Sequence, residues 1–188
     1  MQKILLLDAD GVVLKKREYF SERFAREQGI PVEEMQGFFK TEFKLCQTGK
    51  ADLKEVLKDK LAGWGWEKSV DEFLEYWFTD VELDEEVLAV VQDLRARGIQ
   101  CFLSTDQEKY RKIYLQQLLD GQLDGYFISC DLGFTKSTPE FFQQVLEKLN
   151  LPALEVSYLD DDQKNVDVAK SLGINAKFYS DIEDLKNL

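Results

Sequence analysis

A chain of 188 residues with 44% hydrophobic and 12% aromatic residues is long enough for one well-packed core and too apolar to be disordered. Its 36 acidic and 24 basic residues leave a formal charge of -12, which argues against a nucleic-acid partner, because phosphate backbones need a basic protein face. The chain contains no histidine, so histidine-based catalysis and histidine metal ligands are excluded.

The sequence gives no sign of export or membrane insertion. Met1–Lys3 precede an apolar run that acids interrupt too early for a signal peptide, and no apolar run is long enough to span a bilayer. The three cysteines, Cys46, Cys101 and Cys130, are widely spaced and fit no metal-ligand pattern. We therefore expect a cytoplasmic protein with reduced, mostly buried cysteines and no membrane partner. The oligomeric state stays open.

The first predicted element is a strand at Ile4–Leu7, whose unbroken apolar run is typical of a parallel strand buried on both faces. It ends in Asp8-Ala9-Asp10-Gly11. Two acids at a strand end can bind a cation or share proton transfer. They can equally cap a turn, because Asp and Gly are common turn residues.

Residues 15–82 are predicted to be wholly helical, without strands. Apolar residues recur at helical spacing in four segments. The first segment starts near Phe20, the second covers Val32–Leu45 and the third covers Leu53–Leu61. The fourth follows Ser69, which is expected to cap its N-terminus.

Two other features of this helical stretch have more than one interpretation. Trp64 and Trp66 are interpreted as packing residues between helices, with a substrate-facing role as the alternative. The basic run Lys15–Arg17 is interpreted as a solvated surface, with contact to an anionic substrate as the alternative.

From Asp84 onward, predicted helices and strands alternate. The strands are Ile99–Leu103, Tyr126–Ser129, Val156–Leu159 and Ala176–Tyr179. The first two helices are Val87–Leu94, with Gly98 as its C-terminal cap, and Tyr110–Leu118. The third begins with Thr138 and Pro139 and reaches Leu149. The fourth ends at Leu172, and a short helix closes the chain. This alternation predicts an α/β fold with a doubly wound parallel sheet and right-handed crossovers.

Polar residues follow three of the predicted strands: Asp8 and Asp10, then Ser104–Asp106, then Asp160–Asp162. The carboxyl ends of parallel strands lie at one edge of the sheet, so these groups are expected to meet there. Crowded carboxylates raise one another's pKa values unless a cation neutralises them. Oxygen ligands without His or Cys favour Mg²⁺. The sequence therefore predicts a magnesium site at this edge.

Four ordered motifs in the chain resemble those of the haloacid dehalogenase-like (HAD) hydrolase superfamily. They are Leu5–Val12, Cys101–Asp106, Lys136–Pro139 and Tyr158–Asp162. The resemblance covers essentially the whole chain. It is greatest to phosphatases with a helical cap inserted after the first strand, including glucose-1-phosphatase-like members. It implies a HAD-like Rossmannoid core of residues 1–14 and 83–188, with residues 15–82 as the helical cap domain.

The resemblance also implies roles for individual residues. Asp8 would be the nucleophile that forms an aspartyl-phosphate, and Asp10 would be the general acid and base. Thr105 and Lys136 would bind the phosphoryl group. Mg²⁺ would be held by Asp8, the backbone carbonyl of Asp10, Asp161 and, directly or through water, Asp160. The implied activity is Mg²⁺-dependent hydrolysis of a small phosphorylated metabolite, such as a sugar phosphate.

The chain departs from the family pattern at two positions. Asp106, also expected near the substrate, stands where the family usually has Asn, and Ser137 stands where it often has Pro. Ser104 is a rival to Thr105 as the phosphate-binding hydroxyl. Asp162 and Asn165 are interpreted as helix-capping or loop-ordering residues and not as metal ligands.

Several other functions are weighed against the phosphatase. A dehalogenase would need neither the metal nor Asp10, so the acids argue against it. A signalling receiver module carries its phosphorylated aspartate in mid-chain and has no helical domain in its first crossover. A phosphomutase would use the same residues, and a non-catalytic ligand-binding relative fits the altered positions 106 and 137. These last two alternatives stay open.

Overall fold

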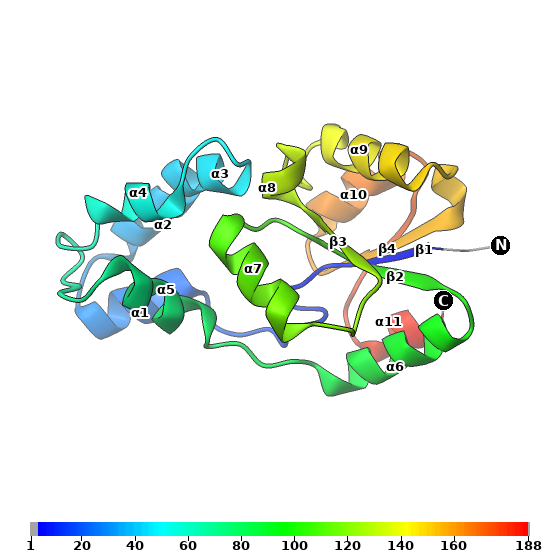
Figure 1. The fold of residues 1–188 in the computed structure, drawn as a ribbon, viewed down its shortest axis with the longest axis horizontal. Helices are drawn as coiled ribbons and strands as arrows, with labels where there is room; N and C mark the ends of the chain where they lie inside the picture. The colour runs from blue at the N-terminus through cyan, green and yellow to red at the C-terminus, as the bar shows by residue number, and fades with distance from the viewer. Residues whose placement is uncertain (1–3, 188) are drawn as a thin grey trace.

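The computed structural model describes residues 4–187, so Met1–Lys3, where the signal-peptide prediction begins, lie outside the described residues. Within that range one sheet holds five parallel strands in the order β3-β2-β1-β4-β5 (Figure 1). The strands are β1 (Ile4–Leu7), β2 (Gln100–Thr105), β3 (Gly125–Ile128), β4 (Val156–Asp160) and β5 (Asn175–Phe178). The predicted doubly wound parallel sheet is confirmed. Because β1 lies between β2 and β4, the three strand ends that carry polar residues are adjacent.

Helices cover both faces of the sheet, and β1 contributes to both cores. Leu5 and Leu7 pack in one apolar cluster, and Ile4 and Leu6 pack in the other. The first cluster includes residues of α6 (Glu85–Ala96), α7 (Lys109–Leu118) and α11 (Ile182–Lys186). The second includes residues of α8 (Ser129–Leu132), α9 (Pro139–Leu149) and α10 (Gln163–Ser171), and the short 3-10 helix η1 (Ala153–Glu155) precedes β4.

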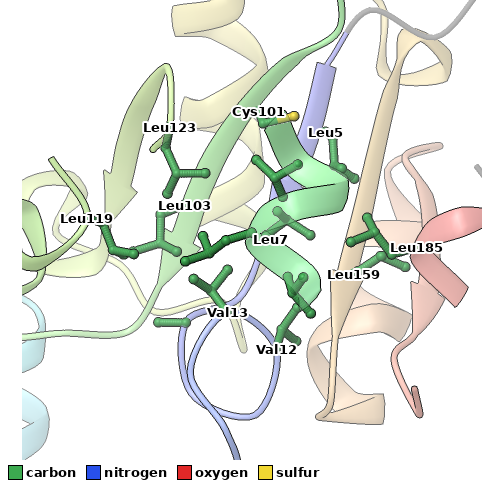
Figure 2. Close-up of a cluster of buried hydrophobic side chains, with 14 of the residues drawn as sticks. Leu5, Leu7, Val12, Val13, Cys101, Leu103, Leu119, Leu123, Leu159 and Leu185 are labelled. Atoms are coloured by element: carbon green, nitrogen blue, oxygen red, sulfur yellow. The ribbon is translucent and has the colours of Figure 1, made fainter. Parts of the chain in front are cut away.

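Buried apolar side chains anchor the loop after β1 to the core. Val12 and Val13 are buried and point into the cluster that contains Leu7, Leu103 and Leu159 (Figure 2). This anchoring fixes the backbone that carries the first aspartates. The apolar core therefore holds the start of the candidate site in place.

Between β1 and β2 the chain forms a helical segment, residues 15–82, that lies beyond one end of the sheet (Figure 1). Its helices are α1 (Phe20–Gln28), α2 (Val32–Lys40), α3 (Glu42–Gln47), α4 (Leu53–Lys58) and α5 (Val70–Phe78). They share an apolar cluster of their own, in which Trp64 is buried and Trp66 packs at the edge. The interpretation of both tryptophans as packing residues is confirmed.

Two predicted helices of this segment are shorter than the sequence suggested. The helix predicted at Val32–Leu45 is broken at Thr41, whose φ of -121° and ψ of -89° are not helical. The Thr41 hydroxyl donates to the Gly37 carbonyl at 2.7 Å, a local bond that competes with helix continuation. The helix predicted to reach Leu61 ends at Lys58, before turns that contain Gly63 and Gly65.

Smaller corrections concern the ends of elements in the core. Ser129 starts the short helix α8, which was not predicted, and Tyr179 lies beyond β5. Thr138 precedes α9, but its hydroxyl donates to the Thr135 carbonyl at 3.1 Å and does not cap the helix. The caps expected at Ser69 and Asp162 are confirmed by bonds from backbone N–H groups to their side chains.

The two chain connections to the helical segment run side by side. Leu14 and Leu83 form an antiparallel bridge, and the Lys15 N–H donates to the Glu82 carbonyl at 2.8 Å. On the opposite side, the Tyr110 hydroxyl of α7 donates to the Asp52 carboxylate at 2.8 Å. The helical segment is therefore joined to the core at its linkers and at a second, separate contact.

Within residues 4–187, no helix combines the length and apolar character needed to cross a bilayer.

The three thiols are expected to react slowly in the folded protein. Burial raises the pKa of Cys46 and Cys130 to about 11 and that of Cys101 to about 12. Because the thiolate is the reactive form, we expect alkylation by iodoacetamide at pH 8 to be at least about a hundredfold slower than in urea. Mass spectrometry of timed samples measures both rates. Native alkylation of any cysteine at the unfolded rate would contradict this prediction.

A candidate active site at the carboxyl edge of the sheet

Asp8 stands at the carboxyl end of β1 and is 7% exposed. The Asp8 carboxylate accepts a hydrogen bond of 2.7 Å from the Ala9 N–H. The backbone N–H of Asp8 donates to the Leu159 carbonyl of β4 at 3.0 Å. The loop then passes close to the fourth motif. Gly11 has a φ of +89°, and a Cβ there would lie 2.5 Å from the Asp161 Oδ2 atom. Only glycine permits this approach without displacing Asp161.

Lys136 is the central cation of the site and is 3% exposed. Its Nζ atom lies 2.6 Å from Asp8 Oδ1 and 2.7 Å from Asp160 Oδ2. Burial disfavours the charged form of Lys136, but the carboxylates of Asp8, Asp160 and Asp106 outweigh it and raise the lysine pKa above its ordinary value. Burial raises the pKa of Asp8, and Lys136 opposes that shift. The lysine is thus an internal counter-ion and not a solvated surface residue.

The acids after β4 have different surroundings. Asp160 is fully buried and accepts bonds from the Tyr158 hydroxyl, from Asn165 Nδ2 at 3.2 Å and from the Asp162 N–H at 2.7 Å. Burial, followed by the Asp160 charge, raises the pKa of Tyr158 well above its ordinary value, so the phenol stays a donor. Asp161 is more open and forms an ion pair of 2.8 Å with Lys16. Asn165 orders Asp160, as expected.

Three carboxylates of the site form a group suited to a metal ion. Asp8, Asp160 and Asp161 each offer one oxygen, and these oxygens lie within 4.8 Å of one another. An all-oxygen donor set of carboxylates fits Mg²⁺, which binds few protein ligands and keeps several waters. The three carboxylates predicted for the magnesium site therefore lie together.

The Asp10 carboxylate is held by two residues that were not predicted. Arg111 Nη2 lies 2.5 Å from Asp10 Oδ1, and Gln107 Nε2 donates to Asp10 Oδ2 at 2.8 Å. Gln107 lies in the loop that follows β2, and Arg111 lies in the first turn of α7. No local pattern in the sequence connects either residue with Asp10, so sequence reasoning missed both.

The structure distinguishes the two hydroxyls at the end of β2. Thr105 lines the cavity at the site, and its Oγ1 accepts a bond of 3.2 Å from Gln107 Nε2. Ser104 does not line that cavity, and its buried hydroxyl has no hydrogen-bond partner among residues 4–187. This placement is consistent with Thr105 as the phosphate-binding hydroxyl.

Asp106 lies beside the cavity and orders the third motif. Its Oδ1 accepts a hydrogen bond of 2.9 Å from the Lys136 N–H, and its carbonyl accepts one of 3.1 Å from Gln47 Nε2. Burial raises the pKa of the Asp106 carboxyl. An asparagine oxygen could make the same bond to Lys136, so the acid adds only its charge.

We expect Asp106→Asn to keep the fold and to lower KM for a phosphate ester. The substitution preserves an acceptor for the Lys136 N–H and removes a negative charge near the incoming dianion. At the dielectric of a protein surface this repulsion corresponds to roughly a three- to tenfold change in KM. Steady-state kinetics of the two proteins measure it, with Asp106→Leu as the control that loses the acceptor. An unchanged KM in Asp106→Asn would show that this charge does not act on the substrate.

A cavity of about 500 Å³ opens in front of these groups. The core contributes Asp8, Asp10, Thr105, Asp106 and Lys136 to its lining, and the helical segment contributes side chains from residues 15–81. Every residue predicted for the site except Asp160 lines this cavity, and Asp160 lies behind Lys136. The basic run Lys15–Arg17 lines it too, so this run is not only a solvated surface.

The family model for haloacid dehalogenase-like hydrolases matches residues 2–173. The chain belongs to the haloacid dehalogenase-like hydrolases. Among curated proteins, it is 26% identical over 96 residues to the sesquiterpene phosphatase astK of Aspergillus oryzae. That alignment covers 48% of this chain and 47% of the relative, so the chain spans about half the length of the curated relative.

Solved structures show the same fold in enzymes of this superfamily. The magnesium complex of the HAD family enzyme BT-2542 from Bacteroides thetaiotaomicron has a TM-score of 0.84 and 18% identity, with 100% of this chain and 99% of that chain covered. Its complex with magnesium and inorganic phosphate has a TM-score of 0.75 and 20% identity, covering 96% and 95%. The L-2-haloacid dehalogenase PA0810 has a TM-score of 0.72 and 16% identity, covering 96% and 85%. The fold alone therefore does not separate phosphatases from dehalogenases.

Proposed function

We propose that this HAD-like hydrolase is a Mg²⁺-dependent phosphatase that hydrolyses a small phosphate monoester. The observation that carries the proposal is the arrangement of Lys136 between Asp8 and Asp160, beside the open carboxylate of Asp161. A phosphoryl dianion could not approach this many acids unless cations were present. Here a buried lysine and a cation site stand next to the proposed nucleophile.

In this proposal Asp8 attacks the phosphorus atom and forms an aspartyl-phosphate, while Asp10 gives a proton to the departing alcohol. Asp10 then takes a proton from water, the water oxygen attacks the phosphorus atom, and Asp8 and inorganic phosphate are released. Gln107 and Arg111 orient the Asp10 carboxylate for both transfers. Thr105 and Lys136 contact the phosphoryl oxygens. Asp8, Asp161, Asp160 and the Asp10 carbonyl would hold Mg²⁺, which would neutralise the charge of the phosphoryl group.

The comparisons support this choice over the dehalogenase chemistry. A curated relative is named a phosphatase, and BT-2542 was solved with magnesium and inorganic phosphate. In this chain Asp10 lines the cavity and is held there by two side chains, which a carbon–halogen mechanism would not need.

We also propose that residues 15–82 act as a cap on the core formed by residues 1–14 and 83–188. Side chains of both parts line the same cavity, and the two linkers run side by side as a hinge would. Closure would exclude bulk water from the phosphoryl group. A helical cap inserted after the first strand is the arrangement in which this chain resembles the glucose-1-phosphatase-like phosphatases. A cytoplasmic location fits the three free cysteines.

A metal and product assay tests the proposal. With a generic aryl phosphate and Mg²⁺ we expect release of inorganic phosphate and the aryl alcohol in equal amounts. Treatment with EDTA should lower the rate at least about a hundredfold, because the acids around Asp8 would repel the substrate. Added Mg²⁺ should restore the rate, and Ca²⁺ serves as the control ion.

Three results would contradict the proposal. Full turnover in EDTA would exclude the metal-dependent mechanism. Conversion of a sugar monophosphate into its positional isomer, without release of inorganic phosphate, would identify a phosphomutase. Tight Mg²⁺ binding without hydrolysis of any ester in a broad panel would identify a non-catalytic binding protein.

A further inference from the structure

Aromatic side chains of the helical segment form part of the cavity lining. Phe20, Phe39, Phe43 and Trp77 of the helical segment all line it. The rings of Phe20 and Trp77 are stacked with centroids 4.8 Å apart, and Phe39 meets Trp77 edge-on at 5.3 Å. Phe20 and Phe39 are only partly buried, so each keeps exposed ring surface where it lines the cavity. These packed rings, called the aromatic wall below, give the cavity an apolar surface contributed by the helical segment.

The basic residues around this wall are already paired with acids. Lys15 lies 2.5 Å from Glu82, Arg17 lies 2.7 Å from Asp80, and Arg23 also pairs with Asp80. The two remaining cations that line the cavity outside the Lys136 site, Lys16 and Arg111, contact acids of the catalytic edge. Within the described lining no cation is left unpaired. A second phosphate or a carboxylate on the substrate would have to break one of these ion pairs.

The three amide side chains of the lining are also engaged, and its hydroxyl side chains are those of Tyr19, Ser21 and Thr105. The amides of Gln47, Gln107 and Asn165 donate to the Asp106 carbonyl, to Asp10 and to Asp160. A sugar placed against the aromatic wall would bury several hydroxyl groups, and each buried hydroxyl without a partner is costly. An apolar group placed there replaces water at the ring surfaces at no such cost.

We infer that the substrate is the monophosphate of a hydrophobic alcohol, whose alkyl or aryl chain lies on the surface formed by Phe20, Phe39, Phe43 and Trp77. This inference rests on the proposed phosphatase function and names its substrate class. The cavity of about 500 Å³ is within the size range of small-molecule sites. Phe39 and Phe20 are specificity-determining residues, because they contact the leaving group and not the phosphoryl group.

A homologous series of substrates tests the inference. With ethyl, butyl and hexyl phosphate, kcat/KM should rise by roughly threefold to fourfold for each added methylene, the value for transfer of one methylene out of water. Hexyl phosphate should exceed glucose 6-phosphate at least tenfold. In Phe39→Ala the ratio of kcat/KM for hexyl phosphate to kcat/KM for ethyl phosphate should fall at least about fivefold.

Trp66→Ala is the matched control. Trp66 is a partly buried aromatic residue of the same helical segment but does not line the cavity, so its removal should leave the hexyl-to-ethyl ratio unchanged. Thermal unfolding checks that each variant is folded. If Phe39→Ala does not fold, Phe20→Leu replaces it, with the same expected change of ratio.

A binding measurement separates the inference from the proposed function. Calorimetry with the Asp8→Asn variant should show that hexylphosphonate binds at least tenfold more tightly than methylphosphonate. Preferred hydrolysis of glucose 6-phosphate, or equal ratios in Phe39→Ala and wild type, would overturn the inference and leave the phosphatase. Tight hexylphosphonate binding without hydrolysis of any ester would overturn the phosphatase and leave the apolar site. Absence of both would overturn both.

Discussion

Replacing Asp8 by asparagine is expected to lower kcat for phosphate ester hydrolysis by at least about a thousandfold at saturating Mg²⁺. The amide is nearly isosteric with the carboxylate, but it is a poor nucleophile and carries no charge. The Asp8 carboxylate pairs with Lys136 and also offers one of the three oxygens that could hold the cation. The substitution therefore removes the attacking atom and one metal donor together.

Acid quenching distinguishes these two effects. With radiolabelled substrate, the wild-type protein should show a labelled phosphoenzyme after rapid quenching that hydroxylamine removes, as expected for an acyl phosphate. The Asp8→Asn protein should show none at any Mg²⁺ concentration. If excess Mg²⁺ restored turnover to this variant, Asp8 would be a metal ligand only and another residue would be the nucleophile.

Asp131→Asn is a suitable control for this experiment. Asp131 lies on α8, pairs with Lys112 at 2.7 Å and does not line the cavity. Loss of its charge changes the net charge of the protein by the same amount as Asp8→Asn. Its kcat should remain within about twofold of wild type, because surface charges away from a site contribute little.

The strand ends could be predicted from the sequence because the information is local. A continuous apolar run followed by acids is visible at Leu5–Asp10 and again at Tyr158–Asp162, and parallel topology brings such ends to one edge of the sheet. The burial of Ile4–Leu7 on both faces follows from the same run. The fold and the acidic half of the site therefore needed no information about distant contacts.

The residues around Asp10 could not be predicted in the same way. Arg111 is separated from Asp10 by 101 positions in the chain, and no local pattern shows which acid an arginine will meet. The break at Thr41 was missed for a related reason. Apolar periodicity continues through it, and only the local backbone conformation ends the helix.

The basic run Lys15–Arg17 shows a third limit of sequence reasoning. The run was interpreted either as a solvated surface or as a contact for an anionic substrate. Its side chains line the cavity, yet each one is paired with an acid, and both partners of two of these pairs are well exposed. Charge patterning along the chain could not show this pairing, because Asp80, Glu82 and Asp161 come from other segments.

Replacing Lys136 by methionine is expected to lower the free energy of unfolding by about 3–5 kcal/mol, the cost of leaving buried charges unpaired. Methionine matches the length of the lysine side chain but lacks the ammonium group between Asp8 and Asp160. Urea unfolding in EDTA measures the change without a bound cation to compensate it. Catalytic activity should also be lost, because the phosphoryl group loses its closest protein cation.

Two further variants show whether this loss arises from the buried charges. Lys186→Met breaks a pair with Glu183 in which both side chains are about half exposed or more, so it should change the free energy of unfolding far less than Lys136→Met does. In Lys136→Met combined with Asp160→Asn one unpaired acid is removed, and part of the lost stability should return, while activity should not. A double variant that is less stable than Lys136→Met would contradict this explanation. It would show that the hydrogen bonds to Asp160, and not the neutralisation of its charge, stabilise the carboxyl end of β4. Lys136 would then be needed for the chemistry of the site but not for the fold.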